Sequence, residues 1–272
     1  MANVGELFGR VWALTVGDRQ WSDLRVTFEV QKTLNRHPNP GQITIFNLAK
    51  STRDSLQRGN VVRLVAGYQG GADVVYVGEL VEVTSQRDGA DWVTTMSCKD
   101  GDTAWMRNVR ASYRTGANLA TVAKDLATGM GLTVAPGSLT ALQGLQVRGS
   151  LVQAGQAHRA LQTLLEPHGY TWSVQDGVLQ ILATNGATAE TVVVLNPQTG
   201  LVGSPERMAD KGQSSKRTKV RATSLLQGAI RPGRLVQLQS EQIAGTYRCN
   251  EVLHKGDSHG GEWYTEMVLQ GA

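Results

Sequence analysis

The stretch at residues 63–96, RLVAGYQGGADVVYVGELVEVTSQRDGADWVTTM, returns without gaps at residues 234–267 as RLVQLQSEQIAGTYRCNEVLHKGDSHGGEWYTEM. Nine of the 34 aligned positions are identical, whereas chance gives roughly two at about 6% per position. Both copies alternate apolar and polar residues between glycine-containing turns, which is typical of strands. The repeat therefore predicts one β module used twice. The repeated residues, expected in the module core or interface, are Arg63, Leu64, Val65, Tyr76, Trp92 and Met96, and Arg234, Leu235, Val236, Tyr247, Trp263 and Met267.

The residues before the first copy continue its β pattern. Alternating residues lie on both sides of a turn predicted at 37–41, and Ser51 is a suitable N-cap for a short helix ending near Leu56. Residues 1–101 are therefore predicted to form a first β-barrel-like module. Its strands are expected at 24–34, 43–46, 61–68, 74–86 and 92–99.

The middle third has a different periodicity. Residues 117–130 and 156–166 place apolar side chains at the spacing of amphipathic helices. Asp176-Gly177 lies between two short apolar runs and predicts a hairpin with a two-residue turn. We expect a small α+β domain at 102–190, with strands near 132–134 and 145–147. His158 and His168 have no ligand-type neighbours in sequence and are expected at its surface.

Residues 191–272 are predicted to form the second β-barrel-like module. A polar connector is expected at about 203–218, before strands at 219–226, 234–240, 246–254 and 263–269. A basic run in and after this connector predicts a solvated segment, and contact with DNA phosphates is the alternative. Its residues are Lys211, Lys216, Arg217, Lys219 and Arg221.

Composition narrows the function classes. Of the 272 residues, 40% are hydrophobic, enough for a core, and the net charge of +4 is far from the clustered excess of a dedicated nucleic-acid binder. Cys98 and Cys249 lie far apart without a metal-type spacing, so both are predicted to be buried free thiols. No apolar run approaches the length that crosses a membrane, so no membrane insertion is expected.

Motifs for catalysis are sparse. The sequence lacks the P-loop, GxSxG, HExxH and dinucleotide-binding patterns. His254, Asp257 and His259 lie within six residues and are the one metal-ligand candidate. Because these ligand residues are not conserved in the equivalent loop of the first copy, residues 83–88, a polar hairpin loop is favoured. The prediction is a non-enzymatic protein with no catalytic residue, metal or cofactor.

Two segments resemble a known family. LRVTFEVQKTLNRHPNPGQITIFNLAKSTRDSL at 24–56 and AIRPGRLVQLQSEQIAGTYRCNEVLHKGDSHGGEWYTEM at 229–267 resemble the opening and closing segments of baseplate hub proteins of contractile-tailed, Mu-like phages. The resemblance is strongest at 24–101 and 220–269. Cys249-Asn250 departs from it, because the family more often has an apolar residue there.

The resemblance implies a structural hub related to the tube-like part of VgrG spikes, with two tail-tube-type modules flanking the α+β domain. Three chains would form a pseudo-six-fold ring that joins a hexameric tail tube to a trimeric central spike. Tube or tube-initiator proteins, the spike and other baseplate proteins would be partners, and DNA would pass through the lumen without sequence-specific binding. The expected location is the virion, after assembly in the host bacterial cytoplasm. Two alternatives stay open: a metal-assisted cell-wall hydrolase at the tail tip, and a channel lining that contacts DNA.

Overall fold

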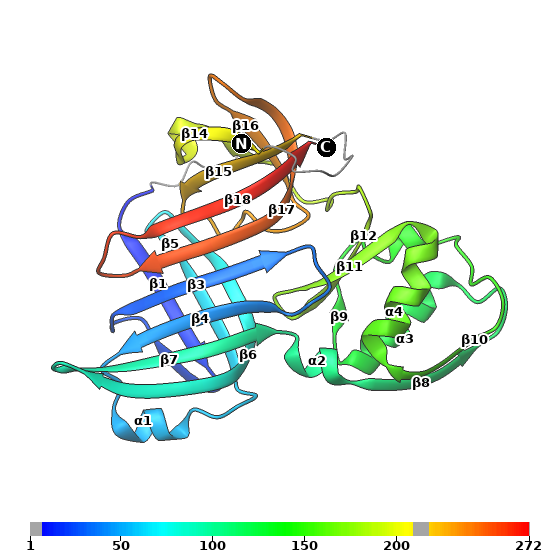
Figure 1. Cartoon of the computed structure of the whole chain (residues 1–272), viewed down its shortest axis with the longest axis horizontal. Coiled ribbons are helices and arrows are strands. Elements are labelled where there is room, and N and C mark those ends of the chain that lie inside the picture. Colours follow the sequence, from blue (N-terminus) through cyan, green and yellow to red (C-terminus); the bar gives the residue numbers. More distant parts are fainter. Residues whose placement is uncertain (1–6, 209–217, 272) are drawn as a thin grey trace.

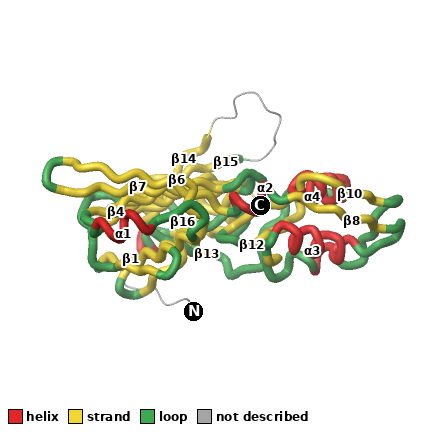
Figure 2. Tube along the Cα trace, turned by 90° about the horizontal axis from the view of Figure 1, so that it is seen from below, coloured by secondary structure: helices red, strands yellow, loops and turns green. Residues whose placement is uncertain are grey.

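The computed structural model of the chain describes residues 7–208 and 218–271. The protein is mainly β, as the sequence predicts, and its principal sheet has 13 strands with mostly antiparallel pairing. Figure 1 shows this broad twisted sheet on one side and a smaller unit of helices and short strands on the other. The tube view in Figure 2 shows that the smaller unit continues the long axis of the molecule.

The N-terminal part of the chain contributes seven strands to the sheet and contains one short α-helix. They are β1 (Arg10–Val16), β2 (Arg19–Trp21), β3 (Val26–Thr33), β4 (Asn39–Phe46), α1 (Lys50–Ser55), β5 (Val61–Tyr68), β6 (Gly71–Asp88) and β7 (Asp91–Asp100). β4 begins inside the segment that was predicted to be a turn. Pro40 is tolerated in this strand although it has no N–H to donate, because it lies beyond Val30–Gly41, the last pair of the β3–β4 ladder.

The middle unit contains three α-helices, two short 3-10 helices (Thr140–Leu142 and Glu166–His168) and two small sheets. Its elements are α2 (Asp102–Met106), β8 (Asn108–Tyr113), α3 (Leu119–Met130), β9 (Thr133–Val134), β10 (Leu151–Gln156), α4 (Ala157–Leu165), β11 (Tyr170–Gln175) and β12 (Val178–Ala183). The strand expected at 145–147 is only a single bridge from Gln146 to Asn118. Asp176 and Gly177 have φ angles of 55° and 79°, as a two-residue hairpin turn requires.

The C-terminal part completes the large sheet. Its strands are β13 (Val193–Leu195), β14 (Leu201–Met208), β15 (Lys219–Leu225), β16 (Leu235–Gln239), β17 (Ala244–Asp257) and β18 (Trp263–Gly271). The predicted connector needs correction, because β14 extends to Met208 and pairs with β15. Its polar composition suits an edge strand with exposed side chains, and residues 209–217 lie outside the described part of the chain.

β17 links the C-terminal strands to the N-terminal strands. Its residues 244–248 pair with β16, its residues 251–257 pair with β3, and its other edge pairs with β18. In Figure 1, β17 lies directly beside β3, and β18 lies on the other side of β17. The strands from the two ends of the chain therefore form one continuous sheet.

Three hydrophobic clusters lie under these elements. The first is formed mostly by residues from β1 to β7, but it also includes Leu226 and Trp263. The second fills the middle unit around α3, α4 and Trp172. The third lies among β13 to β18 and includes Cys249. Cys98 and Cys249 are both buried free thiols, as predicted.

The two halves of the sequence repeat form the same three-stranded meander, β5–β6–β7 and β16–β17–β18. The ungapped alignment, however, matches the strand register only in the last strand. The middle strand has a bulge at Val81 in one copy and at Asn250 in the other, which is an offset of 169 (250 minus 81), not 171. In the first two strands, the identical residues of the alignment therefore do not lie at structurally equivalent positions.

Candidate functional site

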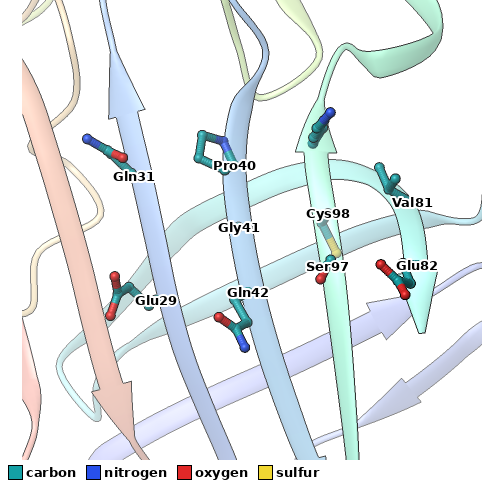
Figure 3. Close-up of a pocket in the computed structure, with 10 residues that line it drawn as sticks. Glu29, Gln31, Pro40, Gly41, Gln42, Val81, Glu82, Ser97 and Cys98 are labelled. Carbon is teal, nitrogen blue, oxygen red and sulfur yellow. The ribbon is translucent and has the colours of Figure 1, made fainter. Parts of the chain in front are cut away.

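A concave patch lies on the outer face of four adjacent strands. It has a volume of about 470 Å³ and lies across β3, β4, β7 and β6. Figure 3 shows its side chains on these strands. The lining residues are Glu29, Gln31, Pro40, Gly41, Gln42, Val81, Glu82, Ser97, Cys98 and Lys99.

Strand periodicity makes this face polar. On the inner side Val30, Ile43 and Met96 are fully buried, so their neighbours Gln42 and Ser97 project outward and are exposed. We call the exposed polar residues of this patch the concave polar face; they are Glu29, Gln31, Gln42, Glu82, Ser97 and Lys99.

Gly41 and Tyr76 explain how the floor of this face is formed. A Cβ atom at Gly41 would lie 2.8 Å from a ring carbon of Tyr76, so only glycine allows the buried ring to lie directly behind the strand. The Tyr76 hydroxyl donates a hydrogen bond to the Asn39 carbonyl at 3.0 Å. Burial raises the pKa of Tyr76 far above its ordinary value, so the hydroxyl stays a donor.

The charge of the concave polar face differs from that of the whole chain. It carries two carboxylates, Glu29 and Glu82, and one ammonium group, Lys99. The Lys99 Nζ is 3.8 Å from the Asp102 carboxylate at the rim. The face is thus polar and slightly acidic although the chain has a net charge of +4, and it offers no basic cluster to a phosphate backbone.

The repeated residues have several environments. Tyr76 and Trp263 are buried, whereas Trp92 is 38% exposed. Trp92 lies under the Arg53 guanidinium at 3.7 Å. The others divide into buried Leu64, Met96, Val236 and Met267, half-buried Val65, Arg234, Leu235 and Tyr247, and exposed Arg63.

The metal candidates are not brought together. His254 is fully buried, its Nδ1 lies 2.9 Å from the Thr265 hydroxyl, and desolvation lowers its pKa to about 3. Asp257 forms an ion pair with Arg25 at 2.7 Å, while His259 is exposed. Residues 7–208 and 218–271 contain no group of three His, Cys, Asp or Glu side chains suited to a metal. The hydrolase alternative therefore has no assembled ligand set in this part of the chain.

The basic run is described only in part. Lys219 and Arg221 are exposed on β15, and Arg221 pairs in register with Glu206 of β14. Lys211, Lys216 and Arg217 lie outside the described residues. His158 corrects another expectation, because it is buried and stacked on Trp105 with ring centroids 3.9 Å apart.

A buried ionic cluster was not predicted from the sequence. Lys32, Asp100 and Asp176 come from β3, the end of β7 and the β11–β12 turn, and we call them the junction cluster. The Lys32 ammonium group donates to both carboxylate oxygens of Asp176 at 2.7 Å, although Lys32 is only 1% exposed. Asp100 accepts hydrogen bonds from the backbone N–H groups of Asp176 and Gly177. Its sequence signal was weak, because the three residues are separated by more than 60 positions.

Comparison with known proteins supplies relatives at the level of structure. No family model matches the chain, and no curated protein matches its sequence. A 43 kDa tail protein of prophage MuSo2 from Shewanella oneidensis has a TM-score of 0.69 at 10% identity, with 96% of both chains covered. The chain shares its fold with this tail protein.

Two secretion-system structures extend this likeness. An E. coli type VI secretion component, described as similar to the T4 phage tail proteins gp27 and gp5, has a TM-score of 0.62 at 10% identity, with 94% of this chain and 76% of that chain covered. A chain of the Francisella PdpA–VgrG complex has a TM-score of 0.58 at 9% identity, with 98% of this chain and 53% of that one covered. The predicted likeness to tail hubs and VgrG-type proteins is confirmed for the fold.

In the described residues, no helix is both long and apolar enough to span a bilayer.

Proposed function

We propose that the protein is a structural hub of a contractile phage tail. The observation that carries this proposal is the match to a prophage tail protein over 96% of both chains, which includes the large sheet and the middle unit together. A shared module alone would support only a common building block. A shared arrangement of all parts supports a shared place in an assembly.

The two meanders support a duplicated module and a pseudo-six-fold ring. Both contain a bulge at the same place in the middle strand, and both follow it with a polar cross-strand pair. The Ser85 and Thr94 hydroxyls lie 3.1 Å apart in the first copy, and the His254 ring and Thr265 hydroxyl lie 2.9 Å apart in the second. Three chains with two modules each would present six similar modules around one axis.

In such a ring, the partners follow from symmetry. A hexameric tail tube or its initiator would contact the six modules, and a trimeric spike would contact the three chains. Other baseplate proteins would bind outside, and the ring would be part of the virion after assembly in the host cytoplasm. The protein would act by matching symmetries and transmitting baseplate rearrangement, without catalysis.

We infer further that the concave polar face lines the channel of the ring. Its exposed glutamines, serine and carboxylates suit a surface in contact with water and passing DNA, because they offer no basic cluster that would retain phosphates. The hydrophobic side of the same strands is already buried in the first cluster. This orientation also leaves the strand edges available to neighbouring chains.

The test is the mass of the purified protein in solution, measured by light scattering over a range of concentrations. With 29.3 kDa per chain, the expected species is a three-chain particle, formed either by the protein alone or on addition of its spike protein. A dimer that persists at all concentrations, or a ring of another symmetry in electron micrographs of assembled tails, would contradict the proposal.

A further inference from the structure

The β11–β12 turn docks the middle unit on the large sheet through buried charges. The Asp176 carboxylate at its tip receives hydrogen bonds from the Lys32 ammonium group and from the Val77 backbone N–H at 3.0 Å. In return, Asp100 accepts from the N–H groups of Asp176 at 2.6 Å and Gly177 at 2.8 Å. The turn is thus held by two carboxyl groups. That of Asp176 belongs to the turn and binds the sheet, and that of Asp100 belongs to the sheet and binds the backbone of the turn.

The charges of the junction cluster do not balance. It contains two carboxyl groups and one ammonium group, so it is neutral only when one carboxyl is protonated. Asp100 is fully buried and the Asp176 side chain is 15% exposed. A net charge in such surroundings is costly because water cannot solvate it. Closure of the turn therefore favours uptake of one proton.

We propose that the β11–β12 turn is a releasable latch that closes with one proton on the Asp100–Asp176 carboxyl pair, so that the middle unit's hold on the sheet weakens as the pH rises. When the turn withdraws, Asp100 meets water, and its carboxyl group ionises without the cost of burial. The closed state binds one proton more than the open state. By linkage, the open state gains population as the proton concentration falls.

The pKa values agree with this direction. Burial, followed by the negative charge of Asp176, raises the pKa of Asp100 from its ordinary 3.8 to about 7. An acid whose pKa is raised in the closed state stabilises that state most below pH 4. This contribution is lost as the pH rises from about 4 to 7, and it is constant above pH 7.

Three other groups that face the cluster keep one protonation state across this range. Tyr76 on β6 and Cys98 on β7 have pKa values raised by burial, that of Cys98 to about 12, so both stay protonated. His254 on β17 faces Lys32, and burial lowers its pKa to about 3, so it stays neutral. Glu79 on β6 also faces Tyr76, and its carboxylate accepts hydrogen bonds from Thr103 on α2.

Hydrogen bonds between uncharged groups hold the same turn at other points. The Asn39 side-chain amide donates to the Val174 carbonyl at 2.9 Å, and the Gln175 amide donates to the Thr33 carbonyl at 2.7 Å. Neither pair titrates, so neither contributes a pH dependence. Any change with pH in how tightly the turn binds the sheet therefore comes from the junction cluster.

The experiment measures hydrogen exchange at the backbone amides of Asp176 and Gly177 by NMR at pH 5 and pH 7.5, corrected for intrinsic exchange rates. In the unaltered protein, the opening equilibrium should rise on the order of 10- to 100-fold between these pH values. Asp100→Asn, which keeps an acceptor but not the charge, should abolish the rise. Asp54→Asn is the matched control, because Asp54 is an exposed carboxylate paired with Lys50 on α1, and it should leave the rise unchanged.

The amide of Ile43, in the centre of the sheet, serves as the internal reference for global opening. If Asp100→Asn does not fold, Asp176→Asn replaces it. That variant removes the neighbouring negative charge, lowers the pKa of Asp100 and should shrink the rise. An opening equilibrium in the unaltered protein that does not change with pH overturns the latch, as does a full rise in either folded variant.

Discussion

Trp263 lies in a core that is built mostly from residues more than 150 positions away in the sequence. Its ring packs edge-on against Phe28 with centroids 5.4 Å apart, and its indole N–H donates to the Gly67 carbonyl at 3.1 Å. Trp92 occupies the aligned position in the repeat, yet it lies at the surface under Arg53. Equal positions in the repeat therefore contribute very differently to stability.

Substitution of these two tryptophans tests that difference. Trp263→Ala should lower the free energy of unfolding by about 3–5 kcal/mol, because it leaves a large cavity and removes the hydrogen bond to the Gly67 carbonyl. Trp92→Ala should cost about 1 kcal/mol or less, since it removes a partly solvated cation–π contact. Urea denaturation of both variants measures the two values. Equal losses would show that the repeat positions share one role.

At the scale of elements, helices and strands that bury one regular apolar face were predicted from the sequence, and strands without such a face were missed. The helices α3 and α4 and the β11–β12 hairpin were predicted within two residues, because each has a periodic apolar face and a defined end. β8 and β10 were missed, since they pair only with each other and alternate between exposed and half-buried positions. β1 was missed because its apolar residues are nearly continuous.

Helix α3 provides a test of its sequence-encoded start. The Asn118 side chain accepts hydrogen bonds from the N–H groups of Ala120 and Thr121 at 2.9 and 3.2 Å. Asn118→Ala should lower the free energy of unfolding by about 1 kcal/mol, whereas Asn118→Ser should retain most of the stability. Thermal or urea denaturation distinguishes the two. Equal stability of the alanine and serine variants would contradict a capping role.

For the molecule as a whole, the order of family-like segments predicted the fold, but the functional surfaces could not be located in advance. The concave polar face consists of alternate residues from four strands, and which side of a strand faces out depends on the partner strands. The bulges at Val81 and Asn250 change that facing within a single strand. The junction cluster depends on a contact between the middle unit and the sheet, which no local pattern encodes.

The channel-facing orientation predicts selective labelling. Cys98 and Cys249 are buried, so Gln42→Cys adds an exposed thiol on the concave polar face. In the free chain, a small maleimide and a maleimide on a large polymer should both react. In the assembled ring, only the small reagent should reach it. Lys50→Cys, exposed on α1, is the control that both reagents should label in the free chain. Equal polymer labelling of Gln42→Cys before and after assembly would contradict the orientation.

Because β3 pairs with β17, the large sheet cannot be completed until late in translation. The paired residues are more than 200 positions apart, so β3 leaves the ribosome long before its partner exists. At 5–20 residues per second the delay is on the order of 10 to 50 s. Throughout that interval one edge of the nascent N-terminal sheet is unpaired, and its core lacks Trp263. The newborn chain must therefore keep this edge from joining other nascent chains until β17 has been translated.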